Sequence, residues 1–319
     1  MFKHLLAPLD GSITAECTLP HLVALARLYQ ARTTLVRVLE CPEAALDKQP
    51  IDPLQWQLYK AEAKAYLDDV AQRLRTEADI ETESVLLEGQ AAQSICDFVH
   101  SNDVALIIIS SHGRSGLSRW NVGSVAHKIV QHAHCSVMIV RAYNAGAQAL
   151  TGLRYARLLV PLDGSQRAEC VLSTAGTLTR AHEAQLLLAH VVVKPEMPRQ
   201  LPLTADDNEL IEHFVIRNRE AATQYMELLR DRLMCPFELR LLTSQNIALA
   251  LHGLADEAKV DLVLLGAHGY SGKPKWSYGS VATSFIEYDS VPLLVVQDVD
   301  PEEVEPTQAE KAAEEKKGH

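Results

Sequence analysis

The chain of 319 residues contains the same two sequence motifs twice, in the same order. The segment 4–12, HLLAPLDGS, returns as RLLVPLDGS at 157–165, an offset of 153 residues. The segment 111–124, SHGRSGLSRWNVGS, returns as AHGYSGKPKWSYGS at 267–280, an offset of 156 residues. Two separated matches at nearly the same offset indicate a duplication, and each copy has the length of one typical domain.

Each half alternates short apolar runs with helical stretches. The first run ends at Asp-Gly-Ser, which favours a strand leading into a serine-capped helix. The runs 104–110 and 261–266 are continuously apolar, as is typical of a parallel strand buried on both faces. The alternation therefore predicts an α/β fold in each half, with a parallel sheet and helices on both faces. The expected strands cover 5–9, 33–39, 85–87, 104–110 and 136–141, then 158–162, 185–193, 238–242, 261–266 and 291–297.

These elements place one domain at 1–143 and a second at 155–299, joined by a linker at 144–154. The last segment, 300–319, has seven acidic and three basic residues and no apolar periodicity. That composition is typical of a disordered acidic tail, which we expect here.

Composition excludes several classes of function. A net charge of −11 and a pI near 5.6 argue against nucleic-acid binding, which needs a clustered basic face. The most apolar run, 104–109, is far shorter than the ~20 residues of a membrane span, so no membrane insertion is expected. The apolar start of the chain meets Asp10 too early for a signal peptide, which predicts a cytoplasmic protein. Six cysteines without CxxC spacing indicate neither a disulfide framework nor a zinc ribbon.

The loop after the fourth strand has the chemistry of a phosphate site. In a parallel sheet, ligands bind beyond the carboxyl ends of the strands. Glycines there let backbone N–H groups approach a phosphate, and a Gly-Ser pair that opens a helix adds amide donors, a hydroxyl and the positive end of the helix dipole. The same loop holds cations that could balance phosphate charge, namely Arg114 and Arg119 in the first copy and Lys273 and Lys275 in the second.

With these motifs the chain resembles the universal stress protein family in its tandem, two-domain form. Family members that bind ATP carry a glycine, two residues, a glycine, nine residues, then Gly-Ser or Gly-Thr. The second copy matches every position and the first departs at one, where Ser110 replaces the first glycine. The matching residues are Gly113, Gly123 and Ser124, and Gly266, Gly269, Gly279 and Ser280.

The resemblance implies two Rossmann-like domains of the HUP (adenine nucleotide alpha hydrolase-like) type, each with a five-stranded parallel sheet. It implies an ATP pocket between strands one and four of each copy, with Mg²⁺ or Mn²⁺ on the phosphates. It further implies an internal pseudo-dimer of the two domains, with a homodimer of chains left open. The residues implied at the nucleotide are Pro8, Leu9, Asp10, Val38, Ser110, His112, Gly113, Arg114, Gly123, Ser124, Val125, Pro161, Leu162, Asp163, Val191, Gly266, His268, Gly269, Gly279, Ser280 and Val281.

Plainer interpretations stand beside these. The glycines could be turn residues, and Asp10 and Asp163 could cap the helices that follow them. His112 and His268 could be packed structural residues, since no carboxylate or nucleophile is spaced to orient them for catalysis. The cluster at 132–135, His-Ala-His-Cys, could be a zinc site or the basic end of a helix. Cys17 and Cys170 could share a redox role or simply pack.

Three functions compete. The first is an ATP-binding stress-response or regulatory protein that is not an enzyme, since neither a GxxxxGK[ST] loop nor a base for an attacking water is evident. The second is a scaffold or carrier with degenerate pockets for a lipid or another apolar ligand. Two residues support this alternative. Ser110 departs from the family pattern, and Pro274 removes a backbone N–H donor from its loop. The third, an ATP-pyrophosphatase, requires a Ser-Gly-Gly-x-Asp-Ser loop that the segment Asp10–Ser12 does not provide.

Overall fold

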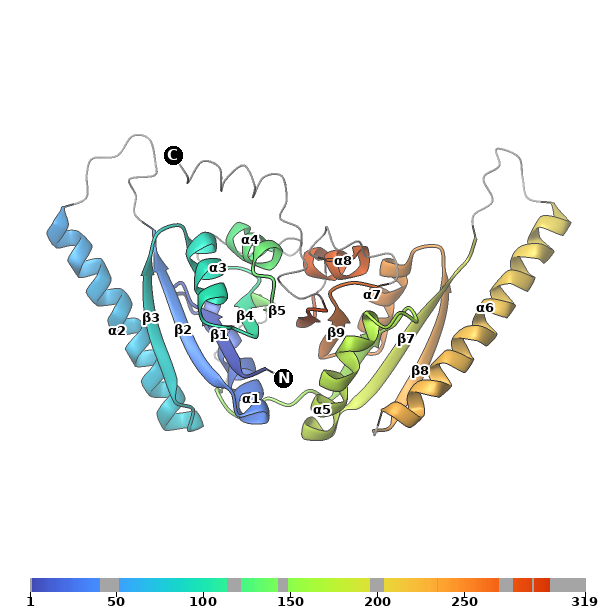
Figure 1. Cartoon of the computed structure of the whole chain (residues 1–319), viewed down its shortest axis with the longest axis horizontal. Helices are drawn as coiled ribbons and strands as arrows, with labels where there is room; N and C mark the ends of the chain where they lie inside the picture. Colours follow the sequence, from blue (N-terminus) through green and yellow to red (C-terminus); the bar gives the residue numbers. More distant parts are fainter. Residues whose placement is uncertain are drawn as a thin grey trace. The chain divides into compact units, whose positions relative to one another are not determined.

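The computed structural model describes residues 2–40, 52–113, 122–142, 149–195, 204–233, 235–269, 278–288 and 290–298. The chain divides into two compact units, Met1–Arg154 and Tyr155–His319 (Figure 1). The predicted tail, 300–319, and residues 144–148 of the predicted linker lie outside the described residues.

The first unit is a five-stranded parallel sheet in the order β3-β2-β1-β4-β5. Its strands are β1 (His4–Pro8), β2 (Arg32–Leu39), β3 (Thr82–Glu88), β4 (Leu106–Ser110) and β5 (Ser136–Val140). Its helices are the 3-10 turn η1 (Ala15–Thr18), α1 (Leu19–Tyr29), α2 (Pro53–Ala78), α3 (Ala91–Ser101) and α4 (Ser124–His132).

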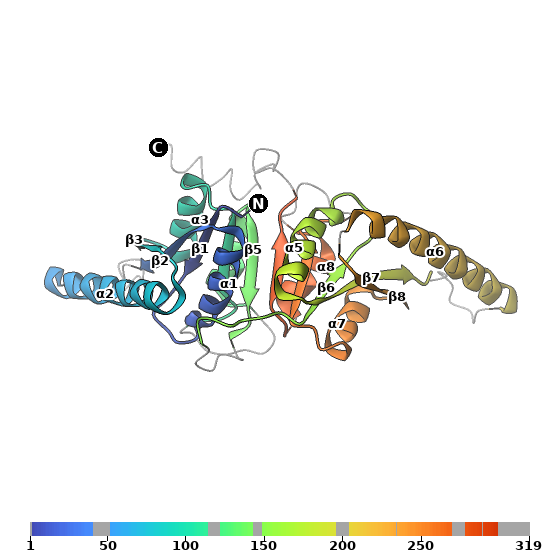
Figure 2. The ribbon, with the colours of Figure 1, turned by 90° about the horizontal axis from the view of Figure 1, so that it is seen from below.

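The strand order determines which helices cover which face. From β1 the chain moves outward to β2 and β3, and it then returns past β1 to β4 and β5. Because crossovers between parallel strands are right-handed, the reversal places α1 and α2 on one face and α3 and α4 on the other. Figure 2 shows α3 across the strands from α1 and α2. The reversal makes the β1–β4 junction the switch point, where ligands bind in such sheets.

The second unit repeats this order as β8-β7-β6-β9-β10. Its strands are β6 (Arg157–Pro161), β7 (Gln185–Val193), β8 (Phe237–Ser244), β9 (Leu262–Gly266) and β10 (Leu293–Val296). Its helices are η4 (Ala168–Val171), α5 (Leu172–His182), α6 (Ala205–Arg232), α7 (Ile247–Glu257) and α8 (Ser280–Tyr288). The predicted fold class, two α/β domains with parallel sheets, is confirmed.

The core of each unit lies on its central strands. All five residues of β1 and of β4 are buried, and so are the first four of β9. These are the continuously apolar runs from which doubly covered strands were expected. The edge strand β3 is longer than the predicted 85–87, because Thr82 to Ser84 are polar and only pairing with β2 defines them as strand.

The turn after the first strand departs from the expected single helix. Ser12 Oγ accepts the Ala15 N–H at 3.1 Å, and Thr18 Oγ1 donates to the Ala15 carbonyl at 2.8 Å, so the segment begins as a 3-10 turn. The α-helix starts only at Leu19, with Pro20 in its first turn, where a missing N–H costs nothing. The predicted serine cap is therefore present one turn before the helix proper.

A polar contact ties this turn to the long second helix in both units. In the first unit Glu16 of η1 accepts hydrogen bonds from Tyr66 at 3.0 Å and Arg73 at 2.7 Å, both on α2. In the second unit Glu169 accepts the same two bonds from Tyr225 at 3.0 Å and Arg232 at 2.5 Å. Burial, followed by the neighbouring glutamate, raises the pKa of both tyrosines, so their hydroxyls stay protonated donors at neutral pH.

Within the described residues, none of the helices combines the length and the apolar character that a bilayer crossing would require.

Substitution of Ile107 by alanine is expected to destabilise the first unit strongly. Its side chain is fully buried on β4, so Ile107→Ala leaves a cavity and lowers the free energy of unfolding by about 2–5 kcal/mol. Urea unfolding followed by circular dichroism measures the change. The control is Ile13→Ala, because Ile13 is 76% exposed and its loss should cost less than about 0.5 kcal/mol. Equal losses in the two variants would contradict the assignment of β4 to the core.

Candidate functional site

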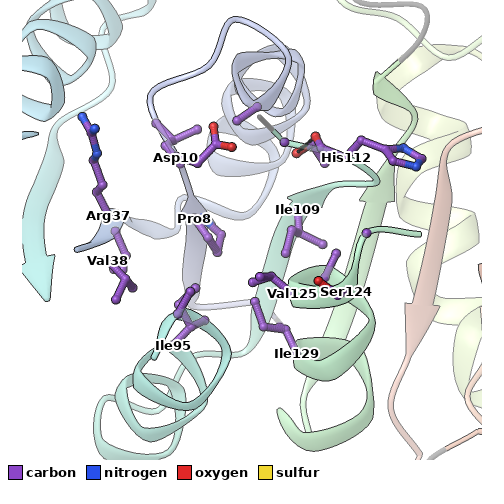
Figure 3. Close-up of a pocket in the computed structure, with 18 of the residues that line it drawn as sticks. Pro8, Asp10, Arg37, Val38, Ile95, Ile109, His112, Ser124, Val125 and Ile129 are labelled. Carbon is purple, nitrogen blue, oxygen red and sulfur yellow. Dashed lines mark hydrogen bonds between the residues drawn. The ribbon is translucent and has the colours of Figure 1, made fainter. Parts of the chain in front are cut away.

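A cavity of about 490 Å³ opens at the carboxyl ends of β1 and β4 in the first unit (Figure 3). A smaller cavity of about 150 Å³ occupies the same place in the second unit. The first is lined by Pro8, Leu9, Asp10, Val38, Ser110, His112, Gly113, Gly123, Ser124 and Val125 of the expected residues. The second is lined by Pro161, Leu162, Asp163, Val191, Gly266, His268, Gly269, Gly279, Ser280 and Val281. Each unit thus brings its expected residues together at one place.

Of that set, Arg114 lies outside the described residues. So do Arg119, Lys273 and Lys275, whose charges were expected to face phosphate, and Pro274. Their positions stay predictions.

An aspartate carboxylate lies against a glycine backbone at the centre of each site. Asp10 Oδ1 accepts hydrogen bonds from the Ser12 N–H at 2.9 Å and from Ser12 Oγ at 2.6 Å. A Cβ added to Gly113 would come 2.2 Å from Asp10 Oδ2, so only glycine leaves room for the carboxylate. Asp163 and Gly269 repeat this contact with the same 2.2 Å separation. The aspartate therefore closes its own turn and joins the loop after β1 to the loop after β4.

Ser110 is accommodated by a hydrogen bond within its own loop. Its hydroxyl donates to the His112 carbonyl at 2.8 Å. At the equivalent Gly266, an added Cβ would meet the Arg167 carbonyl at 3.1 Å and the Ala168 Cα at 3.3 Å, on the side of the turn that follows β6. The cavity beside Ser110 is the larger of the two.

Apolar side chains form the inner wall of the first cavity. Figure 3 shows Pro8, Val38, Ile95, Ile109 and Ile129 directed toward a common space. They come from β1, β2, α3, β4 and α4. Such a slot fits a flat apolar group with polar edges, and few side chains on this wall can hydrogen-bond to it.

The backbone of Val38 supplies the polar partners that the wall lacks. In a parallel ladder, alternate residues of a strand direct both their N–H and C=O toward the same neighbour. Val36 faces β1, because its carbonyl accepts the Leu9 N–H at 2.8 Å, and Leu39 faces β3, because its carbonyl accepts the Gly89 N–H at 3.0 Å. Val38 therefore faces the β1 side, beyond the end of that strand, and offers one donor and one acceptor to the cavity.

The start of α4 forms the other end of the cavity. Gly123 is the N-cap and has no side chain to satisfy the amides of the first turn. Its own N–H donates to the Ser111 carbonyl at 2.7 Å, which holds the helix start against the β4 loop. The free first-turn amides and the Ser124 hydroxyl are suited to an anion.

Eleven of the residues that line the first cavity escaped the sequence analysis, and four of them bring new elements or charges to it. Arg37 lines it from β2 and Glu40 from just beyond the end of that strand, and Ala91 and Ile95 line it from α3. The Glu40 carboxylate accepts the Ala91 N–H at 2.9 Å, and the Arg37 guanidinium lies 5.3 Å from the centre of the Tyr66 ring. In an α/β unit the first turn of every helix lies at the carboxyl edge, so the position of Ala91 was a usable signal.

The two loop histidines make different contacts. In Figure 3 the His112 ring points away from the cavity, and His112 Nδ1 lies 3.1 Å from Ser111 Oγ. His268 Nδ1 lies 2.7 Å from Asp298 Oδ1, and Arg167 Nε donates to Asp298 Oδ2 at 2.6 Å. Packed rings held by neighbours favour the structural interpretation of both histidines.

The remaining candidates for chemistry are a histidine pair and two cysteines. His134 stacks on His100 with 5.9 Å between ring centres. Among the described residues, no group of three or more metal-binding side chains is arranged to hold an ion. Burial raises the pKa of the Cys17 and Cys170 thiols to about 12, so both stay protonated at neutral pH, which favours packing over redox chemistry.

Substitution of Gly113 by alanine tests the carboxylate contact. The added methyl group must displace Asp10 from Ser12, so Gly113→Ala should lower the unfolding free energy by about 1–3 kcal/mol. The control is Gly253→Ala in α7, where an added Cβ meets nothing within 4 Å and helix propensity should raise stability by up to about 1 kcal/mol. Thermal unfolding measures the stability of both variants. A Gly113→Ala protein as stable as the parent would refute the contact.

The Asp298 pairs predict a loss of stability in acid. Burial opposes ionisation of Asp298, but hydrogen bonds from His268 and Arg167 outweigh it and hold its pKa below the ordinary 3.8. A carboxyl pKa that is lower in the folded state contributes stability above its unfolded pKa, and this contribution is lost as the pH falls below about 4. Asp298→Asn should cost about 1–3 kcal/mol at pH 7 and progressively less toward pH 3.

Urea unfolding at several pH values measures this difference. Asp256→Asn, at an exposed position on α7, serves as the control and should show little change at any pH. A cost for Asp298→Asn that does not depend on pH would exclude a charged Asp298 in the folded protein.

The model of the Universal stress protein family matches residues 1–141 and again 154–297. Universal stress proteins of Mycobacterium tuberculosis and Mycobacterium bovis are each 23% identical over 297 residues, covering 90% of this chain and 95% of theirs. A universal stress protein of Methanocaldococcus jannaschii is 28% identical over 142 residues, covering 44% of this chain and 83% of that protein. The crystal structure of a universal stress protein from Archaeoglobus fulgidus has the same fold, with a TM-score of 0.66 at 18% identity, over 94% of this chain and all of that one. With the family pattern matched separately in each half, the chain belongs to the universal stress protein family and carries two copies of its domain.

Proposed function

We propose that the protein binds an adenine nucleotide, ATP with Mg²⁺ or Mn²⁺ on its phosphates, and acts in stress response or regulation through the occupied site. The observation that supports this most is the continuity of the cavity in the first unit. It joins an apolar slot to the start of α4, and so fits a ligand with a flat base at one end and an anion at the other.

Adenine fits the base end of this cavity. Its edge presents an amino donor beside a ring-nitrogen acceptor, which complements the C=O and N–H that Val38 directs into the cavity. Ile95 and Ile129 offer apolar surface to the faces of the ring. The same backbone geometry holds at Val191, because the Ala189 carbonyl accepts the Leu162 N–H at 2.8 Å where β6 ends.

A divalent ion fits the anionic end. Mg²⁺ bound to nucleotide phosphates keeps several waters and takes few ligands from the protein. The oxygen ligands that the described residues provide there are the Ser124 hydroxyl and the Asp10 carboxylate. The ion would neutralise phosphate charge in this part of the cavity.

A regulatory role without ATP hydrolysis agrees with the hydrogen bonds that the carboxylates of the cavity make. Asp10 accepts two hydrogen bonds from Ser12, and Glu40 accepts the Ala91 N–H. Both groups therefore hold the backbone in place, and neither is set up to activate a water. Nucleotide occupancy would act on the loops after β1 and β4, which carry the surface offered to a partner.

A carrier of a lipid or another apolar ligand is the second candidate. The apolar wall formed by Pro8, Val38, Ile109 and their neighbours favours it. The start of α4, where Gly123 leaves the first-turn amides uncapped, suits an anion and not an apolar ligand. This feature favours a nucleotide over a lipid.

Two measurements test the proposal on the purified full chain. Denaturation followed by mass spectrometry of the supernatant should release an adenine nucleotide, and calorimetric titration with ATP and Mg²⁺ should give a binding heat. Gly123→Val should reduce the heat at least about tenfold, because the new side chain crowds the Ser111 carbonyl, 3.4 Å from the position of Cβ, where the start of α4 is held to the β4 loop.

Gly253→Val is the matched control, since an added Cβ there meets nothing within 4 Å, and it should bind like the parent. Absence of both nucleotide and heat in the parent protein would refute the proposal. A lipid in the supernatant would establish the carrier in its place.

A further inference from the structure

The two cavities differ in size by more than the motifs suggest. Ligand sites for molecules of nucleotide size have volumes of about 300–1,000 Å³. The first cavity, at about 490 Å³, lies within this range, and the second, at about 150 Å³, lies below it. Yet the second unit has the complete set of glycines, and the first has Ser110 in place of one of them.

Larger side chains in the second unit account for the difference at the base end. The first residue of the third helix is Ala91 in the first unit and Ile247 in the second. The sixth residue of the fourth helix is Ile129 in the first unit and Phe285 in the second. Phe285 is fully buried and stacks on His252 with 4.2 Å between ring centres. Ile129 lines the first cavity, whereas the Phe285 ring packs between α7 and α8 and does not line the second.

The wall along the second strand is also shorter in the second unit. The first cavity extends along β2 from Val36 to Glu40, while the lining on β7 stops at Val191. Arg37 brings a positive charge to the first cavity. At the corresponding place in the second unit, His190 turns to donate from Nδ1 to the Leu162 carbonyl at 2.8 Å. Of these two positions, only the first carries a permanent positive charge, and its guanidinium lies against the Tyr66 ring.

An ion pair further restrains the second loop. Asp298 bridges Arg167 and His268, and the last of these directly precedes Gly269. The corresponding residues in the first unit are Thr14 and Ala142, which provide neither charge. The second loop is thus held to the end of β10, which opposes any widening of its cavity to admit a base.

We infer that the nucleotide base binds in the first unit alone, so that each chain holds one adenine nucleotide. The inference rests on the proposed function and narrows it to one of the two sites. The second unit keeps the glycines of the motif, but its cavity of about 150 Å³ lies below the range of nucleotide sites.

Calorimetric titration of the full chain with ATP and Mg²⁺ tests this directly. A stoichiometry near one ATP per chain is expected. Ala91→Ile, which copies the second unit into the first, should weaken binding by about tenfold or more. Ile247→Ala, the reverse exchange at the matched position, should leave that binding unchanged.

A second measurement remains decisive if Ala91→Ile perturbs the fold. The parent protein is irradiated with 8-azido-ATP, digested, and its labelled peptides are mapped, with label expected between residues 2 and 142 only. Two equivalents of ATP, or label on peptides of 155–298, would overturn the inference and leave the proposed function intact. Absence of any ATP binding would overturn both.

Discussion

The contact between an aspartate carboxylate and a glycine backbone organises each of the two sites. Asp10 and Gly113 meet where β1 and β4 end, the junction at which the strand order reverses. The reversal leaves a crevice at this edge, and the contact sets how closely the two loops approach across it. Because a Cβ at Gly113 would overlap the carboxylate, the glycine allows Asp10 to stay bonded to Ser12, before any ligand is considered.

A second contact, also present in both units, holds the turn that carries the aspartate. Glu16 and Glu169 each accept hydrogen bonds from a tyrosine and an arginine of the long second helix. The glutamate follows the aspartate by six residues in both units, so the turn that carries the aspartate is anchored to a helix on the opposite side of its loop. Pairs of this kind, partly exposed to solvent, contribute little to stability, and their effect is on geometry.

The units differ in the side chains at the base end of the site, whereas two of its turns are kept. The Asp-Gly-Ser turn and the Gly-Ser helix start keep the same hydrogen bonds in both copies. The exchanges of Ala91 for Ile247 and of Ile129 for Phe285 change only side-chain volume on α3, α4 and their counterparts. Both exchanges alter how side chains fill this part of the unit and leave the hydrogen bonds of the turn and of the helix start in place.

The sequence by itself determined the duplication, the α/β class of both halves and the residues that gather at the carboxyl edge. These depend on local rules: alternation of apolar runs with helices, and the placement of every strand-to-helix turn at one edge of a parallel sheet. Only the tertiary structure decided which cavity is larger, how the Ser110 hydroxyl is satisfied by the His112 carbonyl, and that Arg37, Glu40 and Ile95 line the site. Cavity volume depends on side chains from five elements far apart in the chain, and no local pattern records how they fill a common space.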